Sequence, residues 1–136
     1  MEKTFVMIKP DGVKRQLTGE IIRRFEAKGM KLVAIKKMQV EPPLAREHYQ
    51  EHQGKPFFER LVEHICSGPV VAMIWQGENA VKLARLMIGH RDPLQALPGT
   101  IRGDFAMLST ENLVHGADSI EAAQREASLF FGGIEQ

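Results

Sequence analysis

The chain has 136 residues, 43% of them hydrophobic, and a formal net charge of +1. This length fits one compact domain across residues 1–136, and the small net charge argues against a dedicated polyanion-binding surface. The single cysteine, Cys66, excludes an intrachain disulfide. We find no long apolar stretch and no signal-like start, so we expect a soluble, cytoplasmic protein without membrane contact.

The first third of the chain alternates strand and helix patterns. Residues 4–8 are β-rich, and strong turn chemistry at Lys9-Pro10-Asp11-Gly12 interrupts them. The next pattern is a helix that Thr18 can cap and Gly29 can close. Residues 31–40 then predict a second strand, which two prolines stop.

The middle of the chain predicts two short helices over residues 44–52 and 56–66, followed by an apolar strand over residues 70–75. Asn79 can cap the next helix, which runs through Met87. Residues 90–103 carry two prolines and two glycines without a clear period, and they predict a long loop.

The last strand is ambiguous, because residues 105–108 and 113–115 both fit a short strand. The Asp118-x-x-Glu121 spacing reads as a capping box that opens a helix over residues 119–130. The resulting order of strands and helices is a double βαβ pattern, which is consistent with an α+β sandwich.

One histidine lies in a setting that suits a nucleophile. The segment Asn112-Leu113-Val114-His115-Gly116-Ala117-Asp118-Ser119 places an imidazole at the end of an apolar run beside small, turn-forming residues. A junction of strand and helix start favours anions such as phosphate. A lone histidine in a turn is most often solvated or structural, so the residues alone leave both readings open.

This segment resembles the active-site signature of nucleoside diphosphate kinases, Asn-x-x-His-Gly-Ser-Asp, whose histidine becomes phosphorylated. The resemblance continues over nearly the whole chain, in residues 4–13 (TFVMIKPDGV), 19–22 (GEII), 48–49 (HY), 55–58 (KPFF), 67–73 (SGPVVAM) and 98–105 (PGTIRGDF). It implies a ferredoxin-like fold with a four-stranded antiparallel sheet whose last strand is residues 113–115. It also implies a ping-pong enzyme that passes the γ-phosphoryl group of a nucleoside triphosphate to a nucleoside diphosphate through Nδ1 of His115.

The absence of other phosphate-transfer motifs agrees with a covalent route. The chain has no G-x-x-x-x-G-K-[ST] loop and no G-x-G-x-x-G motif, so neither a P-loop enzyme nor a protein kinase is indicated. An imidazole with an ordinary pKa of about 6.5 is well populated in its neutral form near pH 7. The resemblance gives Glu126 the role of holding the other ring nitrogen of His115, and lets Tyr49 reach His115 through its hydroxyl. Without it, Glu126 reads as a solvated ion-pair partner and Tyr49 as a half-buried aromatic.

A triphosphate needs convergent cations, and the resemblance supplies three of them. They are Lys9, Arg85 and Arg102. From the residues alone, Lys9 is equally well a turn lysine, Arg85 a surface arginine, and Arg102 a salt-bridge partner of Asp104.

The remaining nucleotide contacts are also implied by the resemblance. Phe57 is the open ring on which any base can stack, and Leu61, one helical turn on, extends that platform. Asn112 hydrogen-bonds the sugar hydroxyl. Mg²⁺ is expected to be held by phosphate oxygens and water, with no firm protein ligand. We expect the other histidines on the surface or on helix faces, without a metal site: His48, His52, His64 and His90.

Three residues depart from the family pattern. Arg91 stands where a threonine usually meets phosphate, Ser109 replaces an apolar residue beside the base, and Ala117 replaces the serine that usually bonds the orienting glutamate. These changes bear on rate and base affinity more than on the reaction itself.

The resemblance further implies a homo-oligomer, either a tetramer or a hexamer built from a common dimer, with residues 90–103 as the trimer-contact region. The chain stops soon after Gly133, without the longer tail of many relatives. A nucleic-acid-binding module is the rival from another class, but the chain lacks its [KR]-G-[FY]-[GA]-[FY]-V run. A catalytically dead nucleotide sensor is disfavoured by the presence of His115, Lys9 and Arg102.

Overall fold

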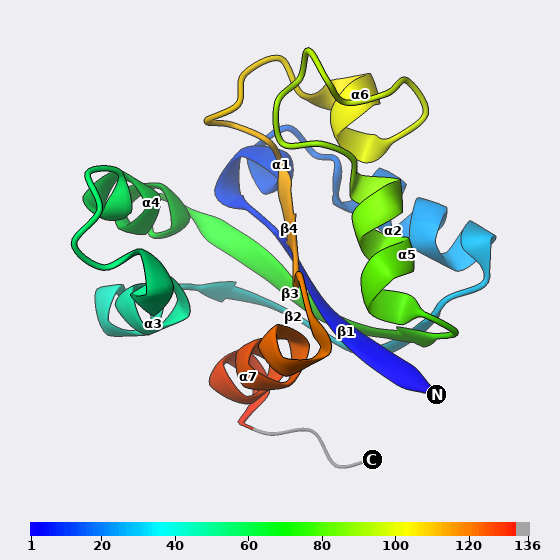
Figure 1. Ribbon diagram of the computed structural model, residues 1–136, viewed down its shortest axis with the longest axis horizontal. Coiled ribbons are helices and arrows are strands. Elements are labelled where there is room, and N and C mark those ends of the chain that lie inside the picture. The colour runs from blue at the N-terminus through cyan, green and yellow to red at the C-terminus, as the bar shows by residue number, and fades with distance from the viewer. Residues whose placement is uncertain (133–136) are drawn as a thin grey trace.

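The computed structural model describes residues 1–132, and its centre is a four-stranded antiparallel sheet with helices on both faces (Figure 1). The strands follow the order β2-β3-β1-β4 across the sheet. Their bounds are β1 Glu2–Ile8, β2 Lys31–Gln39, β3 Pro69–Gly77 and β4 Val114–Gly116. The predicted α+β class and antiparallel ferredoxin-like sheet are therefore confirmed. Gly133, named above at the chain end, lies outside the described residues.

Most of the helices lie where the sequence periodicity predicted them, although their first and last residues differ. Their bounds are α1 Pro10–Lys14, α2 Thr18–Lys28, α3 Pro42–His48, α4 Phe58–Ile65, α5 Ala80–Ile88, α6 Ile101–Phe105 and α7 Ile120–Phe131, with a 3₁₀ turn, η1, at Gln50–His52. None of these helices has the length and apolar character needed to cross a bilayer.

Both faces of the sheet are buried, which explains the continuous apolar run of β1. Phe5 and Met7 point into a cluster shared with α3, α4 and α7, whereas Val6 and Ile8 point into a cluster shared with α2 and α5. Alternate residues of a strand face opposite sides, so a strand covered on both sides needs apolar residues at every position. β4 pairs with β1 with Met7 opposite His115.

Three helix starts differ from the predictions. Lys9-Pro10-Asp11-Gly12 opens α1 rather than a simple turn, with Pro10 in its first turn. Thr18 is the first residue of α2, not its cap. α7 is capped by Ser119, whose hydroxyl accepts from the Ala122 N–H at 3.0 Å, so the predicted Asp118 capping box is wrong by one residue.

Two other segments are divided differently from the predictions. The predicted 44–52 helix begins earlier, at Pro42, and gives way to η1 after His48. Asn79 precedes α5 in a left-handed conformation with φ 51° and makes no side-chain cap. The predicted long loop contains the start of α6, which Thr100 caps by accepting from the Gly103 N–H. The alternative strand at residues 105–108 does not form, and β4 takes its place in the sheet.

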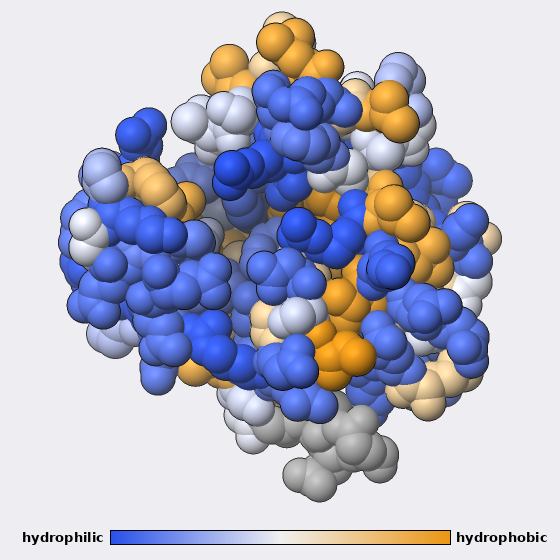
Figure 2. All heavy atoms as spheres, in the orientation of Figure 1, coloured by the Kyte–Doolittle hydropathy of each residue, from blue (hydrophilic) through white to orange (hydrophobic). Residues whose placement is uncertain are grey.

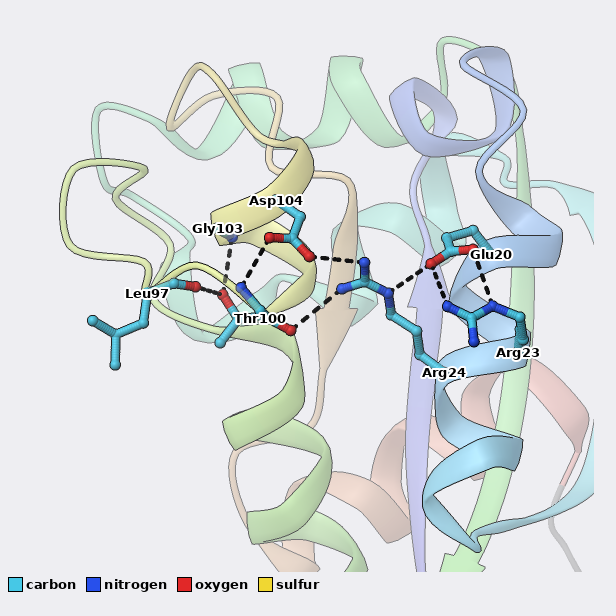
Figure 3. A network of polar contacts seen from close by, with 8 residues as sticks. Glu20, Arg23, Arg24, Leu97, Thr100, Gly103 and Asp104 are labelled. Carbon is cyan, nitrogen blue, oxygen red and sulfur yellow. Dashed lines mark hydrogen bonds and ion pairs between the residues drawn. The ribbon is translucent and has the colours of Figure 1, made fainter.

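A polar network fastens the loop before α6 onto α2 (Figure 3). Arg24 donates to Glu20 and, at 2.8 Å, to Asp104. The other oxygen of Asp104 accepts from the Gly99 N–H at 2.9 Å. These bonds hold both ends of the Gly99–Asp104 segment, which carries Arg102, against the body of the domain.

Candidate active site

His115 projects from β4 and is held by a carboxylate from α7. Its Nε2 lies 2.9 Å from Oε1 of Glu126, whose side chain is buried. Nδ1 of His115 makes no hydrogen bond to any described residue. The geometry therefore leaves Nδ1 as the ring nitrogen available for chemistry.

The surroundings keep this imidazole neutral. Burial lowers the pKa of His115 well below its ordinary value, and the positive charges of Lys9, Arg102 and Arg85 lower it further. Burial also raises the pKa of Glu126 to about 7. A neutral ring that donates from Nε2 to the Glu126 carboxylate carries a lone pair on Nδ1.

Lys9 and Asn112 meet in the site although they lie 103 positions apart in the chain. Nζ of Lys9 donates to Oδ1 of Asn112 at 2.8 Å, and Nδ2 of Asn112 donates to the Ser109 carbonyl at 3.1 Å. Burial and the nearby Arg102 charge lower the pKa of Lys9 to about 8, although Asp11 opposes them. Lys9 is therefore a cation near neutral pH, and it is held beside the strand that carries His115.

Arg102 is buried and bonded to three backbone carbonyls. Its Nε donates to Asn112 at 3.1 Å, Nη1 to Gly89 at 3.1 Å and Nη2 to Val114 at 2.6 Å. The alternative salt bridge to Asp104 does not form, because Asp104 pairs with Arg24.

Two further arginines lie near this cluster. Arg85 donates to the Gly116 carbonyl at 3.1 Å, directly after His115 in the chain. Arg91 is exposed, and its charge helps to lower the pKa of Arg102, after burial and Arg85. Within residues 1–132 Arg91 makes no ion pair with Asp92. Lys9, Arg85 and Arg102 therefore all lie close enough to His115, on β4, to act on its pKa.

The candidate base platform lies at the start of α4. Phe57 is 39% exposed, whereas the adjacent Phe58 is 5% exposed, so one ring is open and the other is core. Leu61 is half-buried one turn further along the same helix. Figure 2 shows mostly hydrophilic side chains around the hollow between the α4 side of the molecule and the segments near α6.

His48, and not Tyr49, is the ring next to His115. Of the two positions expected for His48, on the surface or on a helix face, the structure has it on a helix face, which is buried. The His48 ring is 4% exposed and meets His115 edge-on with centroids 4.9 Å apart. Tyr49 packs against His48 at 4.6 Å and makes no hydrogen bond to His115. The available signal was spacing: His48 lies three residues after the buried Ala45 on the inward face of α3.

Asp11 and His64 form a second contact that the sequence reasoning missed. Oδ1 of Asp11 lies 3.0 Å from Nε2 of His64, and Oδ2 accepts from the Leu113 N–H at 2.9 Å. His64 therefore lies on a helix face, as one of the two expected positions, and is half-buried there with its ring against Asp11. His52 is half-buried beside Phe57, at 5.3 Å between ring centroids, and His90 is exposed as expected.

The described donor groups do not form a magnesium cage. His48, His115 and Glu126 have ligand-type atoms within 4.8 Å of one another. Two imidazoles and one carboxylate suit a softer metal than Mg²⁺, which prefers oxygen donors. How Mg²⁺ is held therefore stays a prediction.

The other two departures from the family pattern have clear positions. Ala117 is buried in the core cluster that includes Phe5 and Phe130, and its methyl side chain has no hydroxyl to offer to Glu126. Ser109 is exposed and contributes its carbonyl to Asn112.

Comparison with known proteins finds one family for the whole chain. The family model described as nucleoside diphosphate kinase matches residues 2–135. A nucleoside diphosphate kinase of Bacillus licheniformis is 60% identical over 96% of this chain and 88% of its own, and one of Crocosphaera subtropica is 60% identical over 99% and 91%. Among solved structures, the Halobacterium salinarum nucleoside diphosphate kinase in complex with CDP is 48% identical, covers 99% of this chain and 92% of its own, and has a TM-score of 0.94. The apo enzyme from Encephalitozoon cuniculi is 43% identical, covers 100% and 92%, and has a TM-score of 0.97.

Proposed function

Because the chain belongs to the nucleoside diphosphate kinase family and is an enzyme of that kind, we propose that it works by a ping-pong mechanism through phosphorylated His115. The observation that carries this proposal is the orientation of the imidazole. Glu126 engages Nε2 at 2.9 Å, and Nδ1 has no partner among residues 1–132. A neutral ring held in this way is a competent nucleophile.

In the first half-reaction, the Nδ1 lone pair attacks the γ-phosphorus opposite the bond to the β-phosphate. That phosphorus–oxygen bond breaks, and its electron pair leaves with the nucleoside diphosphate. The ring becomes positively charged while it keeps its Nε2 proton, and the Glu126 carboxylate stabilises this charge. In the second half-reaction, a terminal oxygen of a different diphosphate attacks the same phosphorus and releases neutral His115.

Lys9, Arg85 and Arg102 neutralise the charge that develops on the transferred phosphoryl group and the leaving oxygen. Support comes from their effect on His115, since these three cations all lower its pKa. Arg91 adds a fourth charge in place of the usual threonine. Mg²⁺, when carried in by the nucleotide, supplies further charge neutralisation.

The nucleotide is oriented by contacts at both of its ends. The open face of Phe57 stacks on the base, with Leu61 extending the platform, and stacking of this kind accepts any base. Asn112 meets the sugar hydroxyl while it holds Lys9. The Tyr49 ring packs against His48, which in turn contacts His115, so Tyr49 would support the position of the His115 ring by packing and not by a hydrogen bond.

We further infer a homo-oligomer, a tetramer or a hexamer built from a common dimer. β2 is an edge strand, and exposed edges tend to find a partner. Several large apolar side chains in the segments that flank α6 are also exposed: Leu94, Leu97, Met107 and Leu108. Figure 2 shows separate hydrophobic groups at the upper end of the molecule. Sedimentation equilibrium distinguishes the two assemblies.

Incubation with γ-labelled ATP and no acceptor tests the mechanism. We expect an acid-labile phosphate on the protein, which added GDP then removes as GTP, with no label on His115→Ala. Substantial transfer by His115→Ala would overturn the covalent mechanism. A protein that binds nucleotide without taking up label would instead be a sensor.

A further inference from the structure

The backbone just before His115 adopts a rare turn. Leu113 has a φ of 76°, which is uncommon for a residue with a side chain. The Val114 N–H donates to the Asn112 carbonyl at 2.8 Å, so these residues close a three-residue turn of the strained γ type. Such strain persists only where the surroundings hold it.

Two groups at the start of α1 hold this turn. Oδ2 of Asp11 accepts from the Leu113 N–H at 2.9 Å, and the Lys9 N–H donates to the Leu113 carbonyl at 2.8 Å. Gly12 permits the approach, because a Cβ at that position would lie 2.8 Å from the Leu113 carbonyl oxygen. The backbone N–H and the carbonyl of Leu113 are thus both hydrogen-bonded to the short segment from Lys9 to Asp11.

The same carboxylate reaches the helix that carries the base platform. Oδ1 of Asp11 lies 3.0 Å from Nε2 of His64, which follows Leu61 by three residues on α4. Burial alone would raise the pKa of Asp11, but the hydrogen bonds and charge of His64 and the Leu113 N–H lower it below its ordinary value. Asp11 is therefore a carboxylate that accepts from two separate elements.

We propose that Asp11 and His64 are positioning residues that join the phosphate end of the nucleotide site to its base end. Asp11 holds the turn that orients Asn112 and His115, and His64 ties α4, with Phe57 and Leu61, to that turn. This inference rests on the proposed function, because it assigns the base to α4 and the phosphates to β4. It differs from a purely structural role in that the two residues affect different parts of the nucleotide.

Substitution of Asp11 tests the phosphate end. Asp11→Ala removes both contacts, and we expect single-turnover phosphorylation of His115 to slow by about tenfold to a hundredfold, the scale of one charge-assisted hydrogen bond. Binding of both ADP and inorganic tripolyphosphate, measured by calorimetry with Mg²⁺, should weaken. Asp11→Asn keeps an oxygen for the Leu113 N–H and should recover most of the rate.

Substitution of His64 tests the base end. His64→Phe keeps a ring of similar size but loses the bond to Asp11, so we expect ADP to bind about threefold to tenfold more weakly while tripolyphosphate binding stays unchanged. Glu63→Gln, at the exposed position that precedes His64 on α4, is the matched control and should leave both unchanged. Equal weakening of both ligands by His64→Phe would overturn the link to the base.

The Leu113 amide proton gives a readout that needs no catalysis. Donation to a carboxylate should place its NMR resonance downfield, and both Asp11 variants should move it. One outcome is that the wild type takes up no phosphate from ATP while the Leu113 amide resonance lies downfield and moves in both Asp11 variants. In that outcome the proposed phosphohistidine mechanism fails, but the contact by which Asp11 holds the Leu113 turn is supported. If Asp11→Ala does not fold, Asp11→Asn and His64→Phe carry the test. Variants that lower the thermal midpoint without changing the single-turnover rate or ligand binding would overturn the proposal.

Discussion

Nε2 of His115 and Oε1 of Glu126 lie 2.9 Å apart, and this contact occupies one ring nitrogen of His115 and leaves Nδ1 without a hydrogen-bond partner among the described residues. The pair joins β4 to α7, two elements that are adjacent in the chain but whose side chains meet only because α7 folds back over the sheet. Its protonation state has consequences for both rate and stability.

We predict that phosphorylation of His115 declines as the pH falls through about 7, because the pKa of Glu126 is raised to about 7 by burial. A protonated Glu126 would donate to Nε2, and the neutral ring would then carry its proton on Nδ1, where it blocks attack. Glu126→Gln can accept from Nε2 at every pH, so its slower reaction should lack this acid decline. Single-turnover rates from about pH 5 to pH 9 measure the effect. An identical acid decline in both proteins would contradict the assignment.

The same pKa predicts the sign of a stability effect. The folded state holds the Glu126 proton to a higher pH than the unfolded state, so stability is lost as the pH rises from about 4.5 to about 7. Glu126→Gln avoids this loss of up to about 3 kcal/mol. Its thermal midpoint, relative to wild type, should therefore be higher at pH 8 than at pH 5. A difference of the opposite sign would mean that the carboxylate is stabilised in its charged form.

Phe57→Ala is expected to weaken nucleotide binding by about 1 to 3 kcal/mol, the usual scale of one stacked base. The ring is 39% exposed, so its removal should cost little stability. Phe57→Trp retains a stacking face and serves as the control. Calorimetry with ADP, GDP and CDP should give similar losses for Phe57→Ala. Preference for one base by several orders of magnitude in kcat/KM would contradict a site that recognises only the ring face.

Arg91→Thr should raise the KM for nucleotide and flatten its dependence on ionic strength. Arg91 is exposed, yet its charge is felt by Arg102, so it adds to the cation cluster where relatives carry a hydroxyl. Lys28→Thr removes one exposed charge at the end of α2 and controls for net charge. KM values for the wild type and both variants, measured from low to physiological salt, test this prediction. No change in the salt dependence would mean that Arg91 points into solvent in the complex.

Ala117→Ser is expected to raise the thermal midpoint, the phosphorylation rate of His115, or both. The added hydroxyl would restore the bond to Glu126 found in the family pattern, with a gain of roughly 0.5 to 1.5 kcal/mol, or around tenfold in rate at most. Ala80→Ser is the matched control, since Ala80 is as buried as Ala117 but belongs to the core cluster on the opposite face of the sheet. No gain in either quantity for Ala117→Ser would mean that this chain supports Glu126 by another route.

Local sequence patterns predicted most helices and strands well, but they did not predict which residue caps α7 or which segment forms the last strand. β1, β2, β3 and α2 follow from periodicity and from Gly29, which closes α2 with φ 106°. The cap of α7 differed by one residue, because Asp118 and Ser119 are both good caps and only the backbone path chooses between them. The choice between residues 105–108 and 113–115 for the last strand likewise depended on which segment could reach β1.

The candidate histidine, the cations and the open ring could be named from the sequence, because these residues lie in short segments whose residue types carry the resemblance. How their side chains meet could be seen only in the folded chain. Lys9 reaches Asn112 across 103 positions of the chain, and His48 comes against His115 from α3. Asp11 holds the strained Leu113 across 102 positions. Contacts at such separations form when the sheet brings distant strand ends together, and no local pattern encodes that distance.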